Sequence, residues 1–272
     1  MKLLCMSERP IWDPRQYLRH SGHRTRPFLD LLARVDAPAP ARVADLGCGA
    51  GNVTALLAER WPAARITGFD NSPQMLERAR RYAGPLLDFA HADAETWAPG
   101  EAAYDLIVSN ALLQWVPGHA DLFPSWVDAL TPGGTFAFQV PGNFSAPSHT
   151  ALAALCDSPR WRGRLGGAGG RGAVVLEPGE YLARLAALGC EADVWETTYQ
   201  QVLPGEDPVL DWVKGTALRP VLTALADDPR ACRAFVGEYA EALRRVPGGP
   251  VRHRVPVPAR LRGRPQGGGR LS

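Results

Sequence analysis

Short apolar runs alternate along this chain with segments whose apolar residues recur at helical spacing. Helical spacing brings every third or fourth residue to one face, whereas a short continuous apolar run is typical of a buried strand. The runs predict strands over 42–46, 65–69, 86–90, 104–110, 135–140 and 191–203. Strands that alternate with helices favour an α/β fold built on a largely parallel sheet.

Helical patterns fill the segments before and between these strands. Ser72 is a good N-cap, and Pro73 suits the first position of the helix that follows. The predicted helices cover 28–35, a segment from 53, a segment from 73, 122–130, 149–156 and 177–188. Residues 207–245 are helical in about three segments broken at Gly215, Pro220 and Pro229, which we interpret as an inserted cap.

A glycine-rich turn joins the first strand to the helix after it. Glycines at 47, 49 and 51 let the backbone turn sharply and approach a ligand closely, because they carry no Cβ. A turn of this kind at the start of a helix, at the carboxyl edge of a parallel sheet, predicts a nucleotide-type ligand. The dinucleotide fingerprint G-x-G-x-x-G is not met, because its last glycine is replaced by Asn52.

An acidic residue ends the second strand. Asp70 follows the glycine turn by close to the ~20 residues expected of an acid that binds ribose. The segment Asp45 to Asn52, followed by Gly68 to Ser72, resembles motif I and its acidic partner in class I S-adenosylmethionine-dependent methyltransferases. The alternative at this point is another Rossmann-like module.

That resemblance implies a Rossmann-like class I methyltransferase fold, a three-layer sandwich with a helical cap after the sixth strand. It implies one methyltransferase domain over 1–246, with the cap at about 204–246. The cofactor is S-adenosyl-L-methionine. The implied cofactor-binding residues are Asp45, Gly47, Cys48, Gly49, Gly51, Asn52, Asp70, Asn71, Met75, Asp93, Ala94 and Asn110. Of these, Asp93 is the candidate acid for the adenine amine; the alternative is a simple helix cap.

Segments further along the chain make the family resemblance more specific. Ser109 to Pro117, Gln139 to Phe144 and Gly215 to Pro220 together resemble the bacterial trans-aconitate 2-methyltransferases. This implies O-methylation of one carboxylate to a monomethyl ester. A carboxylate with a pKa near ~4 is already ionised at neutral pH, so we expect alignment to dominate and name no general base. The resemblance also implies that Gln114 and Trp115 lie near the methyl group.

A polycarboxylate substrate needs cationic and hydrogen-bonding partners. An arginine fork suits a carboxylate best, so Arg219 in the cap is the first candidate. His149, Tyr199, Lys214 and Trp115 are further candidates, each with a plain packing or surface role as the alternative. Trp12 and Tyr17, which precede the sheet, are candidates for a lid over the cofactor.

Composition excludes several other classes. A net charge of +2 gives no sign of a nucleic-acid partner, and no run approaches the ~20 apolar residues of a membrane span. The five cysteines are scattered without C-x-x-C spacing, which indicates free thiols and no metal site. We therefore expect a cytoplasmic monomer that binds a small molecule and contacts neither nucleic acid nor membrane.

The segment 247–272 does not fit the rest. It is rich in Arg, Gly and Pro, and we read no strand pattern in it, so the last strand of the fold is expected to be missing or altered. A basic binding tail, disorder, and a change of reading frame near residue 247 are the three interpretations, and we favour the last. The gene shifted by one nucleotide should then encode an alternating apolar strand.

Two rival functions remain open. One is a methyltransferase that acts on a phenol, an amine or a carrier-bound acid; a nucleophile that must first lose a proton would need a base such as His119 or His149 beside the methyl group. The other is a non-catalytic binding protein that has lost its activity, an interpretation that the altered C-terminus supports. A nucleic-acid methyltransferase is disfavoured, because no N-P-P-Y/F-like tetrad follows the fourth strand.

Overall fold

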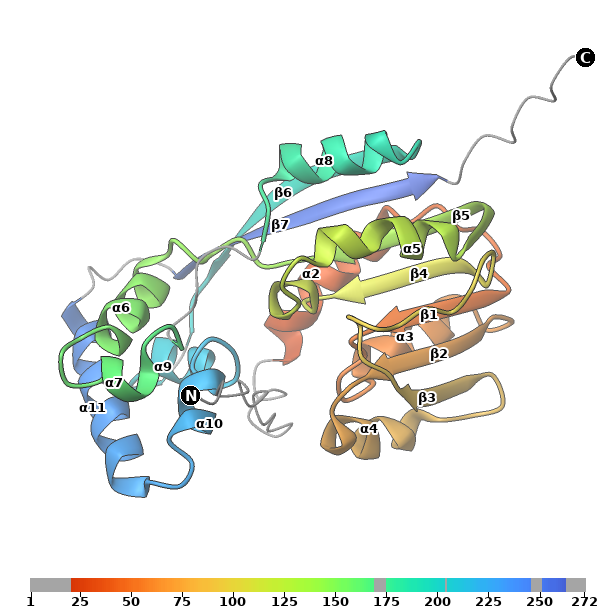
Figure 1. The fold of residues 1–272 in the computed structure, drawn as a ribbon. Coiled ribbons are helices and arrows are strands. Elements are labelled where there is room, and N and C mark those ends of the chain that lie inside the picture. The colour runs from red at the N-terminus through yellow and green to blue at the C-terminus, as the bar shows by residue number, and fades with distance from the viewer. Residues whose placement is uncertain (1–20, 169–174, 204, 246–250, 263–272) are drawn as a thin grey trace, which may run out of the picture. The chain divides into compact units, whose positions relative to one another are not determined.

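The computed structural model describes residues 21–168, 175–203, 205–245 and 251–262. They include a seven-stranded sheet with the order β3-β2-β1-β4-β5-β7-β6 (Figure 1). The strands are β1 Arg42–Leu46, β2 Arg65–Asp70, β3 Leu87–His91, β4 Tyr104–Asn110, β5 Leu130–Gln139, β6 Glu191–Gln201 and β7 Val251–Arg262. The first five pair in parallel. The predicted Rossmann-like α/β fold is confirmed.

Helices cover both faces of the sheet. The helices that belong with it are α2 Ser21–Ala33, α3 Asn52–Arg60, α4 Pro73–Ala79, α5 Phe123–Asp128 and α8 Pro178–Ala187, with short 3-10 turns η1 Arg80–Tyr82, η2 Leu113–Trp115 and η3 His119–Leu122. The core of one face joins Leu46 and Phe138 of the sheet to Phe123 of α5 and Tyr181 of α8. Asp45 points to the opposite face, because side chains alternate along a strand, and there it meets α3. The predicted three layers are therefore present.

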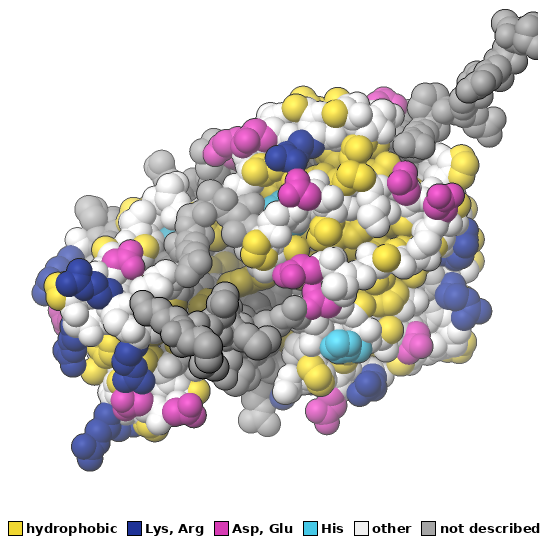
Figure 2. Space-filling view, viewed as in Figure 1, with side chains coloured by type: hydrophobic (Ala, Val, Ile, Leu, Met, Phe, Trp, Pro, Cys, Tyr) yellow, Lys and Arg dark blue, Asp and Glu magenta, His cyan; other side chains and the backbone are white. Residues whose placement is uncertain are grey.

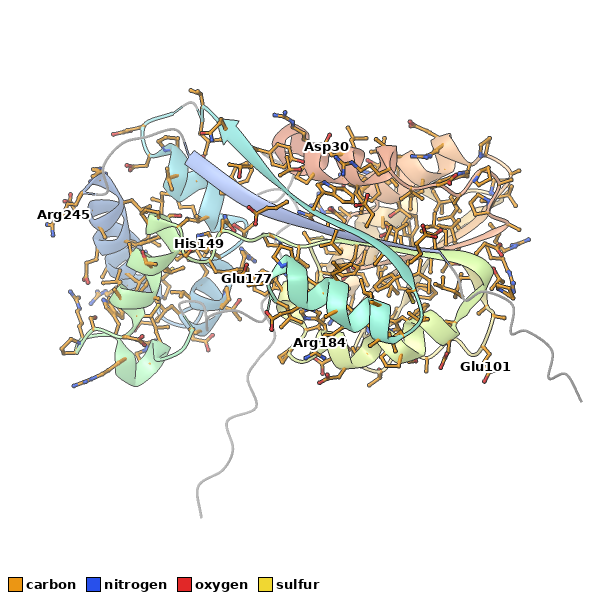
Figure 3. All side chains as sticks on the ribbon, turned by 90° about the horizontal axis from the view of Figure 1, so that it is seen from above. Asp30, Glu101, His149, Glu177, Arg184 and Arg245 are labelled. Atoms are coloured by element: carbon orange, nitrogen blue, oxygen red, sulfur yellow. The ribbon has the colours of Figure 1, made fainter. Side chains whose placement is uncertain are left out.

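Local signals in the sequence explain several helix ends. The side chain of Ser72 accepts from Met75 N, so the predicted N-cap of α4 is confirmed. Glu177 precedes α8 and forms a capping box with Glu180. Arg184 lies further along the same helix (Figure 3), and its guanidinium is 3.3 Å from a carboxylate oxygen of Asp121.

The start of β5 differs from the prediction. The segment Pro132-Gly133-Gly134 has the composition of a turn, yet it lies inside the strand Leu130–Gln139. The pairing with β4 shifts between Tyr104 and Leu106, and Gly133 has φ +81. The three residues therefore form an irregularity within the strand, which continues on both sides of it.

The expectation that the last strand is missing is wrong for the described residues. β7 lies between β5 and β6, and Ala137 of β5 pairs antiparallel with Arg260. Its sequence has apolar residues at alternate positions, namely Val255, Val257, Ala259 and Leu261. Pro256 and Pro258 hide this alternation, since proline is rare inside strands. Residues 246–250 and 263–272 lie outside the described part, and the change of reading frame stays a prediction.

The remaining helices form a second compact unit. They are α6 Pro147–Cys156, α7 Arg162–Leu165, α9 Pro208–Lys214, α10 Arg219–Ala224 and α11 Pro229–Arg245. The three helical segments predicted over 207–245 are confirmed as α9, α10 and α11. They share one apolar core with α6 and α7, which includes Leu152, Trp212, Leu218 and Phe235. The helices of the predicted cap segment thus pack with earlier helices of the chain.

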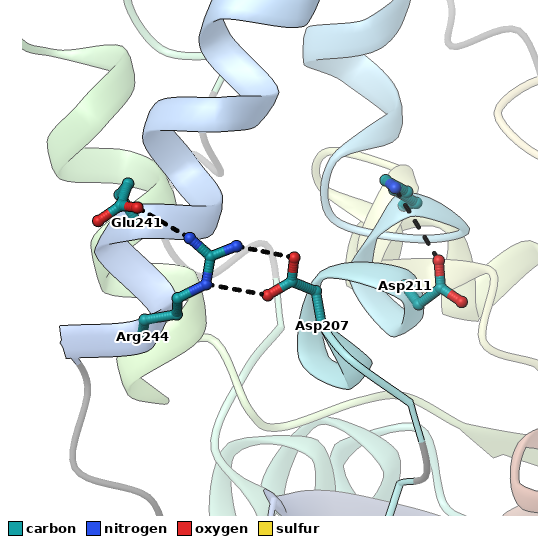
Figure 4. A network of polar contacts seen from close by, with 5 residues as sticks. Asp207, Asp211, Glu241 and Arg244 are labelled. Atoms are coloured by element: carbon teal, nitrogen blue, oxygen red, sulfur yellow. Dashed lines mark hydrogen bonds and ion pairs between the residues drawn. The ribbon is translucent and has the colours of Figure 1, made fainter.

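Ion pairs add to this unit on its surface. The guanidinium of Arg244 on α11 contacts both carboxylate oxygens of Asp207, at 3.2 and 3.0 Å, and also Glu241 at 2.8 Å (Figure 4). Within α9, Lys214 lies 3.9 Å from Asp211. Ion pairs at the surface are screened by solvent and contribute little to stability, so the apolar core is its main source.

Candidate active site

The predicted glycine turn follows β1 and reaches across to β2. The amides of Gly47 and Cys48 both donate to the carbonyl oxygen of Phe69, at 2.8 and 3.0 Å. Gly47, Gly49 and Gly51 have φ of +76, +55 and +79. These values lie in the left-handed region, which glycine adopts without cost, and Gly51 is the N-cap residue of α3.

The three glycines have different surroundings. A Cβ on Gly47 would lie 2.8 Å from Cβ of Leu112, and one on Gly51 would lie 2.9 Å from Cα of Ala79. Both positions therefore require glycine for packing. A Cβ on Gly49 would meet nothing within 4 Å. Gly49 thus exposes bare backbone to open space, as a ligand that approaches the turn requires.

Asp70 ties the glycine turn to the segment after β2. Its Oδ2 accepts from Gly49 N at 2.9 Å, and its Oδ1 accepts from Ser72 N at 2.8 Å. Burial raises the pKa of this carboxyl, while the backbone amides that it accepts from oppose the shift. The predicted acid at the end of β2 therefore fixes the shape of the turn.

Asp45 is fully buried at the base of the site. Its Oδ2 accepts from Oγ1 of Thr54 on α3 at 2.6 Å, whereas Oδ1 has no hydrogen-bond partner among the described residues. Burial raises the pKa of Asp45 from 3.8 to about 7, and the nearby charge of Asp70 adds to the effect. A buried carboxylate oxygen without a donor is costly, so a ligand that brings a donor stabilises it.

The end of β4 contributes a second set of polar groups. Asn110 is 8% exposed, and its Oδ1 has no partner in the described chain. The next residue, Ala111, has φ +54, which is unusual for a residue with a Cβ. Nε2 of Gln114 donates to the carbonyl oxygen of Ala111 at 2.6 Å, while Oε1 of Gln114 is buried without a donor. Trp115 is half-buried in η2.

Gln139 was not among the predicted site residues. It ends β5 and pairs in register with Asn110, and its backbone oxygen accepts from Ala111 N at 2.9 Å. The side chain is 4% exposed, and Oε1 has no donor among the described residues. Its position at the carboxyl end of a predicted strand was the signal that could have identified it, as it did for Asn110.

The other predicted cofactor residues lie along the same edge, in different surroundings. Cys48 and Met75 are buried, Asn52 begins α3, and Asn71 is exposed. Burial raises the pKa of the Cys48 thiol strongly. Oδ1 of Asp93 accepts from Glu95 N at 3.1 Å, which is the contact expected of a cap. Ala94, which follows it, packs against the core.

The predicted substrate residues fall into the two compact units. Arg219 begins α10, Tyr199 lies on β6 and His149 on α6 (Figure 3), all within the unit that holds the second core. Trp115 belongs to the unit of the sheet. Burial lowers the pKa of His149 to about 4, so its ring is neutral at pH 7 and offers hydrogen bonds but no charge. Trp12 and Tyr17 lie outside the described residues.

His119 is one of the two histidines that the rival function would need as a base. Both ring nitrogens of His119 are engaged, since Nδ1 lies 3.1 Å from Val116 O and Nε2 lies 2.7 Å from the Tyr181 hydroxyl. The ring is buried, which lowers its pKa. His119 is therefore held as a structural residue.

The described residues contain neither a group of three or more His, Cys, Asp or Glu side chains that could hold a metal ion nor a helix long and apolar enough to cross a membrane. Charged side chains of both signs lie on the face shown in Figure 2.

The donor and acceptor pattern fits S-adenosylmethionine. Buried acceptor oxygens without donors lie at the ends of β1, β4 and β5, on Asp45, Asn110 and Gln139. The methionyl ammonium of this cofactor carries three N–H donors, and Gly49 leaves open backbone beside the turn. The residues present therefore suit a ligand with a cationic donor at one end.

Comparison with known proteins agrees with this fit. Residues 43–134 match a family model described as a methyltransferase domain. A trans-aconitate 2-methyltransferase of Streptomyces coelicolor is 66% identical over 86% of this chain and 80% of its own length. A protein of the same name from Rhodococcus jostii is 50% identical, over 79% of this chain and 84% of its own.

Solved structures share the fold at low identity. An N-methyltransferase of Haemonchus contortus, solved with S-adenosylhomocysteine, has a TM-score of 0.55 at 15% identity and covers 88% of this chain and 53% of its own. The [4+2]-cyclase SpnF has the same TM-score at 16% identity, covering 94% and 88%. A methyltransferase and a cyclase thus share this architecture, so the fold alone does not define the reaction.

Proposed function

Because the chain belongs to the trans-aconitate 2-methyltransferase family of S-adenosylmethionine-dependent methyltransferases, we propose that it methylates one carboxylate of trans-aconitate. The products are the monomethyl ester and S-adenosylhomocysteine. A bond forms between a carboxylate oxygen and the methyl carbon as the bond from that carbon to sulfur breaks. The observation that carries the proposal is the row of unpaired buried acceptors beside an open glycine turn.

The cofactor residues are assigned along the strand edge. We propose that Asp70 accepts from the ribose hydroxyls and that Asp93 and Ala94 border the adenine, with Met75 beneath it. Gly49 leaves room for the cofactor against the turn, and Asp45 faces the methionyl end. S-adenosylmethionine supplies an already activated methyl group when bound.

The protein's own groups do little acid–base chemistry in this proposal. A carboxylate is ionised at neutral pH, so no residue needs to remove a proton from it. Catalysis then depends on holding oxygen, methyl carbon and sulfur in line and on removing water from the attacking oxygen. The engaged nitrogens of His119 support a route without a base.

The helical unit is proposed as the substrate-covering cap. Arg219 is the first candidate for a carboxylate of the substrate, because a guanidinium can donate two parallel hydrogen bonds to a carboxylate. Lys214 and Tyr199 are further candidates in the same unit, and neutral His149 would contribute a hydrogen bond. Trp115, from the sheet unit, is proposed to border the methyl group together with Gln114.

The chain is also proposed to be a cytoplasmic monomer. Cys48, Cys156 and Cys232 are free thiols, which suits a reducing compartment. Size-exclusion chromatography with light scattering tests the oligomeric state, and a stable dimer would contradict this part of the proposal.

The acceptor is tested by measuring initial rates of S-adenosylhomocysteine formation. Trans-aconitate, citrate and a simple phenol are compared in the wild type, in R219M and in the control R160M. Arg160 is exposed and paired with Glu238. The proposal expects trans-aconitate to be preferred and R219M alone to raise its KM, by roughly 10-fold or more. A preference for the phenol, or an equal effect of both substitutions, would contradict it.

A further inference from the structure

Three neighbouring strands carry, at or next to their carboxyl ends, buried oxygens that lack donors on the described chain. Oδ1 of Asp45 belongs to β1, Oδ1 of Asn110 to β4 and Oε1 of Gln139 to β5. The three side chains are 0, 8 and 4% exposed. All three are acceptors, and each costs free energy while it has no donor.

These side chains share one face of the sheet. Asp45 is level with Val108 of β4, and Asn110 lies two residues further along, so their side chains point the same way. Asn110 pairs directly with Gln139, which puts these two side chains on that face on adjacent strands, about 4.8 Å apart at the backbone. A single ligand group with several donors can therefore serve both amide oxygens.

The backbone around the pair is held in place. Ala111 N donates to the carbonyl oxygen of Gln139, and Ala111 has φ +54. A left-handed conformation is strained at a non-glycine residue and persists where surrounding contacts impose it. Strain of this kind is common at ligand sites, and here it lies between the two amide side chains.

The order of the strands indicates which part of the cofactor reaches the pair. The sheet runs β3-β2-β1-β4-β5, with Asp93 after β3 and Asp70 at the end of β2. Adenine and ribose at those two positions direct the methionyl end toward β4 and β5. The donor at that end is the ammonium group, whose N–H bonds match unpaired acceptors.

We propose that Gln139, paired with Asn110, is a cofactor-binding residue whose side-chain oxygen accepts from the methionyl ammonium of S-adenosylmethionine. The assignment rests on the proposed orientation of the cofactor. It does not depend on which substrate receives the methyl group. A failure of the trans-aconitate assay therefore leaves it standing.

The test compares two ligands in one variant. Gln139→Met keeps the side-chain length and removes the acceptor. Isothermal titration is done with S-adenosylhomocysteine, which has the ammonium, and with 5′-methylthioadenosine, which lacks the whole amino-acid portion. The variant should bind S-adenosylhomocysteine about 10- to 100-fold more weakly, as expected for a lost hydrogen bond to a charged group, and should bind methylthioadenosine unchanged.

A matched control comes from β6. Gln201 also ends its strand, is 5% exposed and has a buried Oε1 without a donor. Gln201→Met should leave the affinity for both ligands unchanged. The unliganded Gln139→Met variant should melt at the same or a higher temperature than the wild type, because an unpaired buried oxygen is removed.

Three results would overturn the proposal. They are an unchanged affinity for S-adenosylhomocysteine, an equal loss of affinity for both ligands, and a variant in which only the KM of the methyl-accepting substrate rises. If Gln139→Met does not fold, Gln139→Glu replaces it, because a carboxylate keeps the acceptor. The ratio of the affinities for S-adenosylhomocysteine and its desamino analogue should then rise above the wild-type ratio, and an unchanged ratio would refute the role of Gln139.

Discussion

Tyr181 donates its phenolic hydrogen to Nε2 of His119 across 2.7 Å. The direction follows from Nδ1, which lies 3.1 Å from Val116 O, a carbonyl that can only accept. Nδ1 therefore carries the proton, and Nε2 must accept. The tyrosine oxygen in turn accepts from Leu176 N at 3.3 Å. One hydrogen-bonded chain thus links η3 to α8 and to Val116, which directly follows η2 with Gln114 and Trp115.

Removing the tyrosine hydroxyl should therefore destabilise the fold without changing the chemistry of the site. Tyr181→Phe leaves Nε2 of His119 buried without a donor, which should lower the free energy of unfolding by about 1–3 kcal/mol. Denaturant unfolding measures the loss, and Tyr82→Phe, at a more exposed tyrosine, is the control. Equal stability of the two variants would show that the His119–Tyr181 hydrogen bond contributes nothing.

His149 should make the protein sensitive to acid. Burial lowers its pKa from 6.5 to about 4. Between these pH values the histidine is protonated in the unfolded chain but neutral in the folded protein. The stability is fully present above pH 6.5 and is lost as the pH falls toward 4, by at most about 1.4 kcal/mol per pH unit. His149→Gln should flatten this part of the pH profile relative to the wild type. A profile that stays steep in His149→Gln would assign the acid sensitivity to other groups.

Substitutions at two glycines of the turn should affect ligand binding and stability differently. Gly49→Ala adds a methyl group in open space at a left-handed φ, which costs about 1–2 kcal/mol, and should fold yet lose affinity for S-adenosylhomocysteine. Gly51→Ala adds contact with the backbone of Ala79 and should lose more stability. Gly84→Ala is the control. Thermal unfolding with and without ligand distinguishes them, and a Gly49→Ala variant with full affinity would place the ligand elsewhere.

Asp45 should be a stability cost that the cofactor offsets. Its folded pKa of about 7 lies above its ordinary 3.8, so the folded protein keeps a proton that the unfolded chain releases between these values. Its contribution to stability falls as the pH rises through that window, by up to about 4 kcal/mol at pH 8. Asp45→Asn should thus gain stability relative to the wild type as the pH rises.

Asp45→Asn should also weaken the binding of S-adenosylhomocysteine, because it removes the carboxylate charge that faces the ammonium group of the ligand. In the wild type the affinity should increase through pH 7, and in Asp45→Asn it should stay low. Melting temperatures at pH 5 and 8, with and without ligand, provide the measurement, with Asp88→Asn as an exposed control. An Asp45→Asn variant that is less stable than the wild type at pH 8 would contradict the assignment.

Much of the sheet unit could be predicted from the sequence, because its signals are local. β4 begins and ends as its apolar run does, and Ser72 caps α4 as its residue type requires. β7 could not be recognised, since Pro256 and Pro258 interrupt its apolar alternation. The start of β5 was missed because Pro-Gly-Gly is a turn signal, which here sits within a strand.

The site was predictable where one residue carries the signal. Asp45, Asp70 and the glycines stand out in a linear motif. Gln139 belongs to no such motif; its position near the end of a predicted strand was a weaker signal, and its place beside Asn110 depends on the register of β4 and β5. The unpaired oxygens, too, are a property of the assembled sheet.

The most direct test of the central claim follows the methyl group itself. The wild-type protein is incubated with S-adenosylmethionine carrying a deuterated methyl group and with trans-aconitate, and the acid is analysed by mass spectrometry. The account predicts one labelled methyl ester per S-adenosylhomocysteine formed, in wild type but not in Gly49→Ala. Binding of S-adenosylhomocysteine without any label on trans-aconitate would contradict the proposed reaction and leave only the cofactor site standing.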